Sequence, residues 1–167
     1  MALSFSNLYA DRTETIAEIG DYIQIAIPLT AWGTTLYLGD TEGQIQFYES
    51  FATNIAVTHG LKYLVKEKRP DSSNLDSFPS GHTSASFQGA VFIHLRYGLK
   101  YAIPAYIAAT YVGFSRVYAN KHYTHDVIAG AIIGSASAVI FTDKYKNIDI
   151  SPIVYNGTYG ATIKYTF

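Results

Sequence analysis

Three short blocks between Lys62 and Asp126 contain residues whose types and order could do chemistry. The first runs from Lys62 to Pro70, the second is Pro79-Ser80-Gly81-His82, and the third runs from Ser115 to Asp126. Together they supply lysine and arginine side chains, a glycine-containing turn and two histidines. Cationic side chains and backbone amides bind phosphate, and an activated imidazole can accept a phosphoryl group. The blocks therefore indicate phosphate binding and phosphoryl transfer.

The first block places three positive charges at helical spacing. Lys62, Lys66 and Arg69 follow one another at i, i+4 and i+7, which predicts that they share one face of a helix. An anion such as phosphate would relieve their mutual repulsion, and the arginine would offer it a planar fork of donors. The alternative is a solvated basic face at a helix C-terminus, where the helix dipole favours cations.

The second block stands directly before a predicted helix. Backbone amides at a helix N-terminus form a seat for an anion. Gly81 would permit a close backbone approach or an unusual dihedral angle, and Ser80 adds a hydroxyl donor. The alternative is an ordinary loop-to-helix turn with a serine cap and a surface His82.

The third block pairs a histidine with a carboxylate. His122 and Asp126 are four residues apart, so on a helix the carboxylate can accept from one ring nitrogen and leave the other as a nucleophile. Arg116 adds another positive group, whereas a structural His–Asp pair is the alternative. Of the other histidines, His59 and His94 are expected to serve packing, and His125 could line the mouth of the site.

In their order, the three blocks resemble the signature of the type 2 phosphatidic acid phosphatase superfamily, which also includes bacterial acid phosphatases and vanadium haloperoxidases. The resemblance extends from Lys62 to about Gly134. It implies a mostly helical bundle with a metal-independent phosphatase site and no cofactor. By the resemblance, His122 would be the nucleophile that forms a phosphohistidine, Asp126 would orient it, and His82 would be the general acid that protonates the leaving oxygen. The phosphoryl oxygens would be held by Lys62, Arg69, Ser80, Gly81 and Arg116.

The resemblance implies a substrate that is a phosphomonoester or a diphosphate. A lipid substrate is expected, such as phosphatidic acid, phosphatidylglycerol phosphate, an isoprenyl diphosphate or lipid A, with a small soluble phosphomonoester as the alternative partner. Vanadate, as a phosphate analogue, is expected to inhibit. Two other functions stay open: a vanadate-dependent haloperoxidase, against which the short chain argues, and a catalytically inactive envelope protein, against which the complete set of motif residues argues.

Composition limits the other classes of function. A chain of 167 residues fits one domain spanning 1–167, and its 49% apolar residues can form a substantial core. A net charge of -1 argues against nucleic-acid binding, which needs a positive field. Cysteine is absent, which excludes disulfides and thiolate metal sites. The His, Asp and Glu spacings do not match a metal site, so no metal is expected.

Hydrophobic periodicity and capping signals predict a mainly α protein, a compact bundle of about five to six helices with a short C-terminal β-hairpin. A short helix could precede Gly20. At the C-terminus, alternating residues and the Asn156-Gly157 turn signal predict the hairpin at about 152–167, with Ile153 to Tyr155 as its first arm. A smooth face for close packing is expected at Gly130, Gly134, Ala136 and Ala138. The other helices are expected at 22–38 with Asp21 as N-cap, 44–68, 82–96, 101–117, and from 124 or 125 to 141.

Location is less strongly indicated. Residues 22–38 contain Gln24, Pro28 and Gly33, residues 127–141 are short for a membrane span, and the mean hydropathy is only +0.08. Both segments are therefore expected to be buried helices of a globular bundle. No signal peptide is visible in residues 1–20. The expected location is the bacterial periplasm or cell envelope, either soluble or in contact with a membrane surface, with the integral inner membrane as the alternative.

Overall fold

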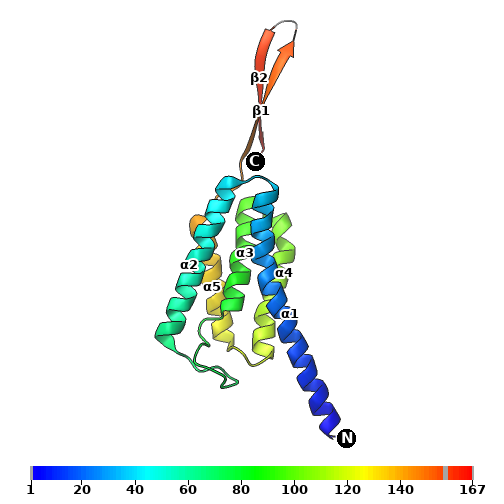
Figure 1. Ribbon diagram of the computed structural model, residues 1–167, viewed down its shortest axis with the longest axis vertical. Helices are drawn as coiled ribbons and strands as arrows, with labels where there is room; N and C mark the ends of the chain where they lie inside the picture. The colour runs from blue at the N-terminus through cyan, green and yellow to red at the C-terminus, as the bar shows by residue number, and fades with distance from the viewer. Residues whose placement is uncertain (1, 156–157, 167) are drawn as a thin grey trace.

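The computed structural model describes the backbone of residues 2–155 and 158–166, and the side chains of residues 11–146. Five helices form a bundle that is followed by two strands (Figure 1). The protein is therefore mainly helical, as predicted. The elements are α1 (Ala2–Tyr37), α2 (Thr41–Val65), α3 (Gly81–Tyr97), α4 (Leu99–Tyr118), α5 (Thr124–Phe141), β1 (Asn147–Tyr155) and β2 (Thr158–Thr166).

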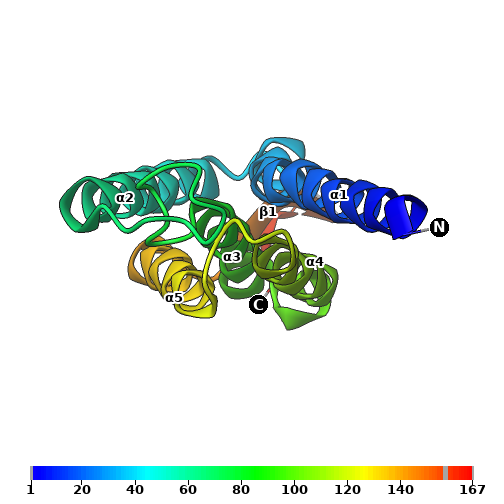
Figure 2. The same ribbon diagram turned by 90° about the horizontal axis from the view of Figure 1, so that it is seen from below.

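Helix α3 lies at the centre of the bundle, with the other four helices around it (Figure 2), and it contacts all of them. Its contact with α5 is close because α5 has glycines there. A Cβ added at Gly130 would lie 2.4 Å from the carbonyl oxygen of Ser80, and one added at Gly134 would lie 2.1 Å from that of Ser84. The predicted smooth face of α5 is confirmed at these glycines, although Ala136 is exposed.

An aromatic cluster fills the core between α2 and α3. The ring of Phe47 packs edge-on against Phe92, with centroids 5.3 Å apart, and stacks on Phe51 at 5.5 Å. Removing a buried aromatic side chain from water stabilises the fold by about 2 kcal/mol. This cluster fixes α2 against α3.

A buried ion pair closes the end of the bundle where α1 passes into α2. Asp40 caps α2 by accepting from the amide of Gly43 at 2.9 Å. Arg96 of α3 donates to both oxygens of this carboxylate, at 2.8 and 2.5 Å, and the Tyr97 hydroxyl donates to it at 2.8 Å. A bidentate pair with its hydrogen bonds satisfied offsets the cost of burying the two charges.

The first helix is longer than the sequence suggested. Helix α1 continues from Ala2 to Tyr37, so the expected break at Gly20 and the expected N-cap at Asp21 are both wrong. Gly20 serves packing instead, because a Cβ there would lie 2.2 Å from the Oγ of Ser115 on α4.

The second helix is shorter at its C-terminal end. Helix α2 ends at Val65, and Lys66 takes a left-handed conformation with φ 51°. Arg69 consequently lies in the loop 66–80, where its amide donates to the carbonyl of Asn74 at 3.0 Å. The prediction that Lys62, Lys66 and Arg69 share one helix face is therefore wrong. Arg69 precedes a proline, a position that disfavours helical backbone.

The two strands pair in antiparallel register, with Ile150 opposite Ile163 and Tyr155 opposite Thr158. Strand β1 begins at Asn147, earlier than the 152 expected from the sequence. The Asn156-Gly157 turn lies outside the described residues.

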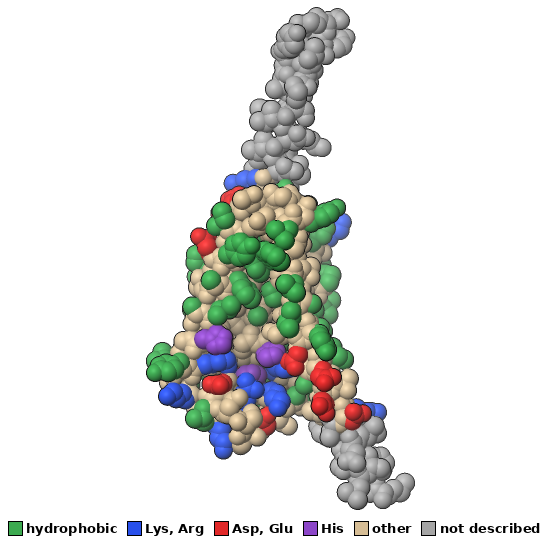
Figure 3. Space-filling view, in the orientation of Figure 1, with side chains coloured by type: hydrophobic (Ala, Val, Ile, Leu, Met, Phe, Trp, Pro, Cys, Tyr) green, Lys and Arg blue, Asp and Glu red, His purple; other side chains and the backbone are tan. Residues whose placement is uncertain are grey.

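The bundle exposes much apolar surface. Figure 3 shows hydrophobic side chains across the middle of one face, with charged and histidine side chains gathered at its lower end. Leu29 of α1 is 55% exposed, and Ile132 and Ile140 of α5 are 62% and 69% exposed. The expectation that both apolar segments are buried is therefore wrong for their outer faces. By length and composition, α5 is the one described helix that could cross a membrane.

Candidate active site

Five of the predicted site residues line one cavity of about 320 Å³. It lies at the end of the bundle where the loop 66–80 and the loop between α4 and α5 meet, the end at which charged and histidine side chains gather in Figure 3. Residues far apart in the chain thus meet here, as the motif order suggested. The predicted residues in the lining are Lys62, Arg69, Gly81, His82 and His122, joined by Gln24, Asn54, Ile55, Thr58, His59 and Ala85.

His122 lies just before α5 rather than on it. Its Nδ1 is 3.5 Å from the Oδ2 of Asp126, which belongs to the first turn of that helix. The pair is brought together although the two residues do not share one helix. The distance is longer than an ordinary hydrogen bond, as catalytic contacts commonly are before substrate binds. Because Nδ1 faces the carboxylate, Nε2 is the nitrogen left for a substrate.

Asp126 is fully buried and held by its surroundings. Its Oδ2 accepts from the Oγ of Ser77 at 2.5 Å and from the amide of Tyr123 at 2.8 Å. Its carbonyl oxygen accepts from the amide of Ser80 at 3.0 Å. The residue therefore joins the second and third sequence blocks through hydrogen bonds.

Burial and charge act together on His122. Burial first, and then the positive charges of Arg69 and Lys62, lower its pKa to about 4, although the Asp126 carboxylate opposes them. The imidazole is consequently neutral near pH 7 and keeps a free lone pair. A neutral imidazole in this setting can act as a nucleophile.

The two cations of the first block that line the cavity, Lys62 and Arg69, are held differently. Lys62 donates from Nζ to the carbonyl oxygen of Asp76 at 2.5 Å. The Nε of Arg69 is buried and makes no hydrogen bond within the described part of the chain. An unsatisfied buried donor is costly, so this atom is well placed to receive an anion. Lys66 lies outside the cavity, with its Nζ 5.3 Å from the ring centroid of Tyr63.

Ser80 and Gly81 play different parts at the start of α3. Ser80 caps the helix, and its Oγ accepts from the amide of Thr83 at 3.4 Å without lining the cavity. Gly81 does line it, but its φ is not positive, so the expectation of an unusual dihedral angle is wrong. A Cβ at Gly81 would lie 3.8 Å from Thr58 and 3.9 Å from Lys62. The glycine therefore leaves open the space that a side chain would occupy beside Thr58 and Lys62.

Arg116 is placed differently from the other predicted phosphate ligands. Its side chain is 5% exposed and does not line the cavity. It donates from Nη1 to the Oδ1 of Asp21 at 2.7 Å and from Nη2 to the carbonyl oxygen of Ala17. Both hydrogen bonds connect the Arg116 guanidinium to α1 instead of the cavity.

Sequence reasoning missed several residues of the site. Asp21, expected to be a helix cap, lies 2.9 Å from the Nε2 of His82 through its Oδ1, and nothing in the sequence blocks signalled this. Thr58 and Asn54 could have been found, because they precede Lys62 by four and eight residues and so share its helix face.

The remaining histidines fall in three environments. His59 lines the cavity, contrary to the expectation that it serves packing, and His94 contacts the hydroxyl of Tyr106 at 2.9 Å. His125 does not line the cavity. Its Nε2 lies 3.0 Å from Glu67 and 3.2 Å from the Oδ1 of Asp126. The possible ligand atoms of Glu67, His125 and Asp126 lie within 4.8 Å of one another. Among the described residues, these three form the group that could hold a metal ion.

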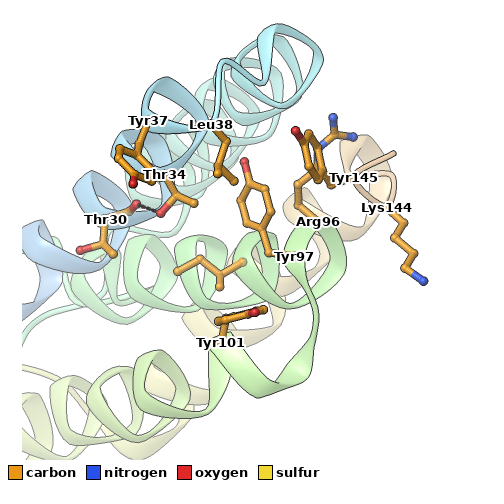
Figure 4. A pocket seen from close by; sticks show the side chains of 10 residues that line it. Thr30, Thr34, Tyr37, Leu38, Arg96, Tyr97, Tyr101, Lys144 and Tyr145 are labelled. Atoms are coloured by element: carbon orange, nitrogen blue, oxygen red, sulfur yellow. Dashed lines mark hydrogen bonds between the residues drawn. The ribbon is translucent and has the colours of Figure 1, made fainter. Parts of the chain in front are cut away.

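A larger cavity of about 530 Å³ lies near the opposite end of the bundle (Figure 4). Tyr97 and Tyr101 line it, together with Thr30 and Thr34 of α1 and Lys144 after α5. Its described lining includes none of the predicted site residues. It is therefore separate from the cavity lined by His82 and His122 (the phosphate cavity).

An apolar groove of about 370 Å³ between α1 and α2 adjoins the phosphate cavity. Gln24 and Ala85 line both. The groove itself is lined by Ile25, Pro28, Leu29, Trp32, Phe47, Tyr48 and Phe51. A ligand with a phosphate in the cavity could therefore extend an apolar group along these helices.

Comparisons with known proteins find similar phosphatases and a solved structure with the same fold. The "Lipid A 4'-phosphatase" of Helicobacter pylori is 30% identical over 146 residues, covering 78% of this chain and 71% of that protein. The "Lipid A 1-phosphatase" of Porphyromonas gingivalis is 34% identical over 105 residues, covering 59% of this chain and only 24% of that protein. The crystal structure of Aquifex aeolicus LpxE shares the fold, with a TM-score of 0.58 at 21% identity, covering 78% of this chain and 92% of that one.

A family model described as the PAP2 superfamily matches residues 44–149. The match contains all three sequence blocks, and it leaves out α1 and almost all of the hairpin. The comparisons support the helical bundle and give no support to the hairpin as part of the shared fold. Since the matched range exceeds half of its length, the chain belongs to the PAP2 superfamily.

Proposed function

We propose that the protein is a metal-independent phosphatase that removes a phosphoryl group from a lipid through a phosphohistidine intermediate. One observation carries the proposal: a neutral His122 and a second histidine, His82, line the same cavity as Lys62 and Arg69. A nucleophile, a proton donor and two cations are the groups that this reaction requires.

The geometry supports a division of labour between the histidines. Nε2 of His122 attacks phosphorus, and Asp126 stabilises the positive charge that forms on the ring. His82 donates a proton to the leaving oxygen and later takes one from the water that hydrolyses the phosphohistidine. Lys62 and Arg69 stabilise the negative charge on the phosphoryl oxygens.

The remaining predicted phosphate ligands contribute in other ways. Gly81 offers a backbone amide at the open wall of the cavity, and Ser80 fixes the N-terminus of α3 behind it. Arg116 acts from outside the cavity through Asp21, which contacts His82. The N-terminus of α3 and the cations Lys62 and Arg69 together favour an anion in the cavity.

The apolar groove supports a lipid as the substrate. A lipid phosphate could place its phosphate in the polar cavity and an acyl chain along the groove beyond Gln24 and Ala85. The names of the relatives, which refer to lipid A, support the same substrate class.

Exposed apolar side chains support an envelope location at a membrane. Helix α5, which could cross a membrane by length and composition, has 18 residues and a length of about 27 Å. This is close to the roughly 30 Å hydrocarbon core of a bilayer. The apolar middle of the bundle would contact lipid, and the polar end that contains the site would lie at the surface (Figure 3).

A direct test of the chemistry uses p-nitrophenyl phosphate in excess EDTA. Wild-type protein should remain active, His122→Asn should lose activity by at least about 100-fold, and vanadate should compete with substrate. Acid-labile radioactive phosphate should be trapped on wild-type protein and not on His122→Asn. Activity that disappears with EDTA, or that survives in His122→Asn, would contradict the mechanism.

A matched pair of variants tests the lipid substrate. Leu29→Asn introduces a polar group into the groove, whereas Leu36→Asn changes an exposed leucine of α1 outside it. Leu29→Asn should lower kcat/KM for long-chain phosphatidic acid and leave p-nitrophenyl phosphate hydrolysis unchanged. Equal effects of the two variants on the lipid would refute the role of the groove.

A further inference from the structure

Asp21 of α1 contacts two side chains, the imidazole of His82 and the guanidinium of Arg116. Its Oδ1 lies 2.9 Å from the Nε2 of His82 and 2.7 Å from the Nη1 of Arg116. We propose that Asp21 is a positioning residue that fixes the tautomer of His82 and keeps it competent as the proton donor to the leaving group. This inference rests on the proposed phosphatase function and adds a residue of α1 to it, outside the family match at 44–149.

The packing of α1 against α4 places Asp21 where this contact can form. Gly20, the preceding residue, has no room for a side chain, since a Cβ would lie 2.2 Å from the Oγ of Ser115 and 2.8 Å from the Nη2 of Arg116. Arg116 also donates to the carbonyl oxygen of Ala17, one turn earlier on α1. The guanidinium therefore binds both the backbone of α1 and the Asp21 carboxylate, and these bonds orient the carboxylate toward His82.

The contact assigns separate tasks to the two ring nitrogens. A carboxylate only accepts, so the Nε2 of His82 that faces Asp21 carries a hydrogen. Neutral His82 then has its lone pair on Nδ1. Within the described part of the chain, that nitrogen makes no hydrogen bond. Nδ1 is consequently the atom that exchanges a proton with substrate and water.

The charges around His82 explain why an anion is needed there. Burial opposes protonation of the ring, and so do the positive charges of Arg116 on α4 and Arg69 in the loop 66–80, whereas Asp21 favours it. Lys62 of α2 and His122 line the same cavity. Without Asp21, burial and the neighbouring cations would lower the pKa of His82 further. A smaller fraction of the protein would then carry the proton that the leaving group requires.

The proton balance follows from this assignment. The first step starts from the imidazolium form of His82, with hydrogen on both ring nitrogens. The bond from phosphorus to the leaving oxygen breaks as the Nε2 of His122 bonds to phosphorus, and the Nδ1 proton of His82 passes to the leaving oxygen, which leaves His82 neutral. In the second step water attacks phosphorus, its proton passes to Nδ1, and the bond between phosphorus and His122 breaks. The hydrogen between Nε2 of His82 and Asp21 stays in place throughout.

The leaving group provides the test, because p-nitrophenolate departs without a proton whereas an alkoxide does not. In Asp21→Asn, kcat/KM for an alkyl phosphate, which reports only the steps up to formation of the phosphohistidine, should fall by about 100-fold or more, the range of general acid catalysis. The value for p-nitrophenyl phosphate should fall by less than about 5-fold. Asp21→Glu, which restores the carboxylate, should recover part of the alkyl phosphate activity.

Two controls separate positioning from a structural role. Glu18→Gln removes a neighbouring exposed charge of α1 and should leave both activities unchanged. Thermal unfolding of each variant measures any loss of stability. An equal loss on both substrates in Asp21→Asn, or no loss on either, would overturn the inference while leaving the phosphatase function intact.

A spectroscopic measurement needs no stable Asp21 variant. The imidazole 15N spectrum of wild-type protein, with His82 assigned by its loss in His82→Asn, should show hydrogen on Nε2 and a bare Nδ1 in the neutral ring. Hydrogen on Nδ1 would overturn the assignment. If wild-type protein lacked EDTA-resistant phosphatase activity, the proposed function would fail first, and the inference would fall with it.

Discussion

His122 combines burial with two nearby cations, and its protonation therefore has a measurable cost. Its pKa is lowered to about 4, against an ordinary value of 6.5 in the unfolded chain. Between these two pH values the unfolded state binds more protons than the folded state, so stability falls as pH drops from 6.5 to 4. The loss is on the order of 3 kcal/mol at most.

This pH dependence can be isolated by comparison with a variant. From pH 7 to pH 4, wild-type protein should lose more unfolding free energy than His122→Asn, which has no proton to gain at this site. Thermal unfolding in matched buffers measures both. The acid limb of kcat/KM should likewise lie near pH 4, because the nucleophile must be neutral. Parallel stability curves, or an acid limb near pH 6.5, would contradict the role of burial.

Gly81 leads to a second prediction at the scale of residues. In Gly81→Ala the new methyl group would make ordinary contacts with Thr58 and Lys62, at 3.8 and 3.9 Å, so the fold should tolerate it. The methyl would occupy the wall of the phosphate cavity, however, and KM should rise by about 10-fold, equivalent to about 1.4 kcal/mol of binding. Steady-state kinetics and a melting curve measure the two effects.

Gly60→Ala supplies the matched control for this change. Gly60 lies on α2, and a Cβ there would meet no atom within 4 Å. This variant should leave KM unchanged and stabilise the helix by up to about 1 kcal/mol. A Gly81→Ala protein with unaltered KM would show that phosphate does not approach this amide.

Spacing in the sequence predicted part of the site, for reasons visible in single residues. His122 and Asp126 meet because Asp126 opens α5 and the preceding turn brings His122 back over it. Arg116 and Ser80 are turned away from the cavity by partners that no local pattern contains. Asp21 enters the site only through the packing of α1, which a motif in residues 62–126 cannot encode.

At the scale of elements, the crossing of α3 and α5 depends on having no side chain at Gly134. A Cβ there would lie 2.1 Å from the carbonyl oxygen of Ser84 and 2.9 Å from the amide of Gln88. Gly134→Ala should therefore force the helices apart and destabilise the protein by about 1–3 kcal/mol. Ser84 contacts the Oγ1 of Thr58 at 3.0 Å, so the shift should also reach the cavity and reduce activity.

Gly33→Ala is the control for this crossing. Gly33 lies on α1, where a Cβ would meet no atom within 4 Å. It should fold at least as well as wild-type protein in thermal unfolding. If Gly134→Ala were equally stable, the glycine contact would not determine the helix spacing.

Helix ends were predicted well where residues next to them in the sequence determine them. Helix α3, flanked by Ser80 and Gly98, lies close to the expected range 82–96, and α5 begins at Thr124, one of the two expected starts. The start of α1 and the C-terminal end of α2 differ from the prediction. Gly20 is used for packing against α4 and does not break α1, and α2 stops short of Arg69, whose loop is held by other bonds.

At the scale of the whole molecule, the apolar groove and the exposed helix faces make one connected prediction about the bilayer. Trp32 is the only tryptophan in the chain, and it lies in the groove between α1 and α2 with its Nε1 donating to the hydroxyl of Tyr48 at 2.9 Å. Its fluorescence therefore reports directly on what fills that groove.

In vesicles, lipids brominated on their acyl chains should quench the fluorescence of Trp32, while aqueous acrylamide should quench it weakly. Burial of apolar surface at about 25 cal/mol per Å² makes lipid, rather than water, the favoured neighbour of this groove. A nonhydrolysable lipid phosphonate should reduce bromolipid quenching in wild-type protein, because its chain would displace bilayer lipid from the groove. It should have less effect in Leu29→Asn, where the chain is held more weakly. Strong acrylamide quenching without bromolipid quenching would place the groove in water, and the substrate's acyl chain would then need another path to the cavity.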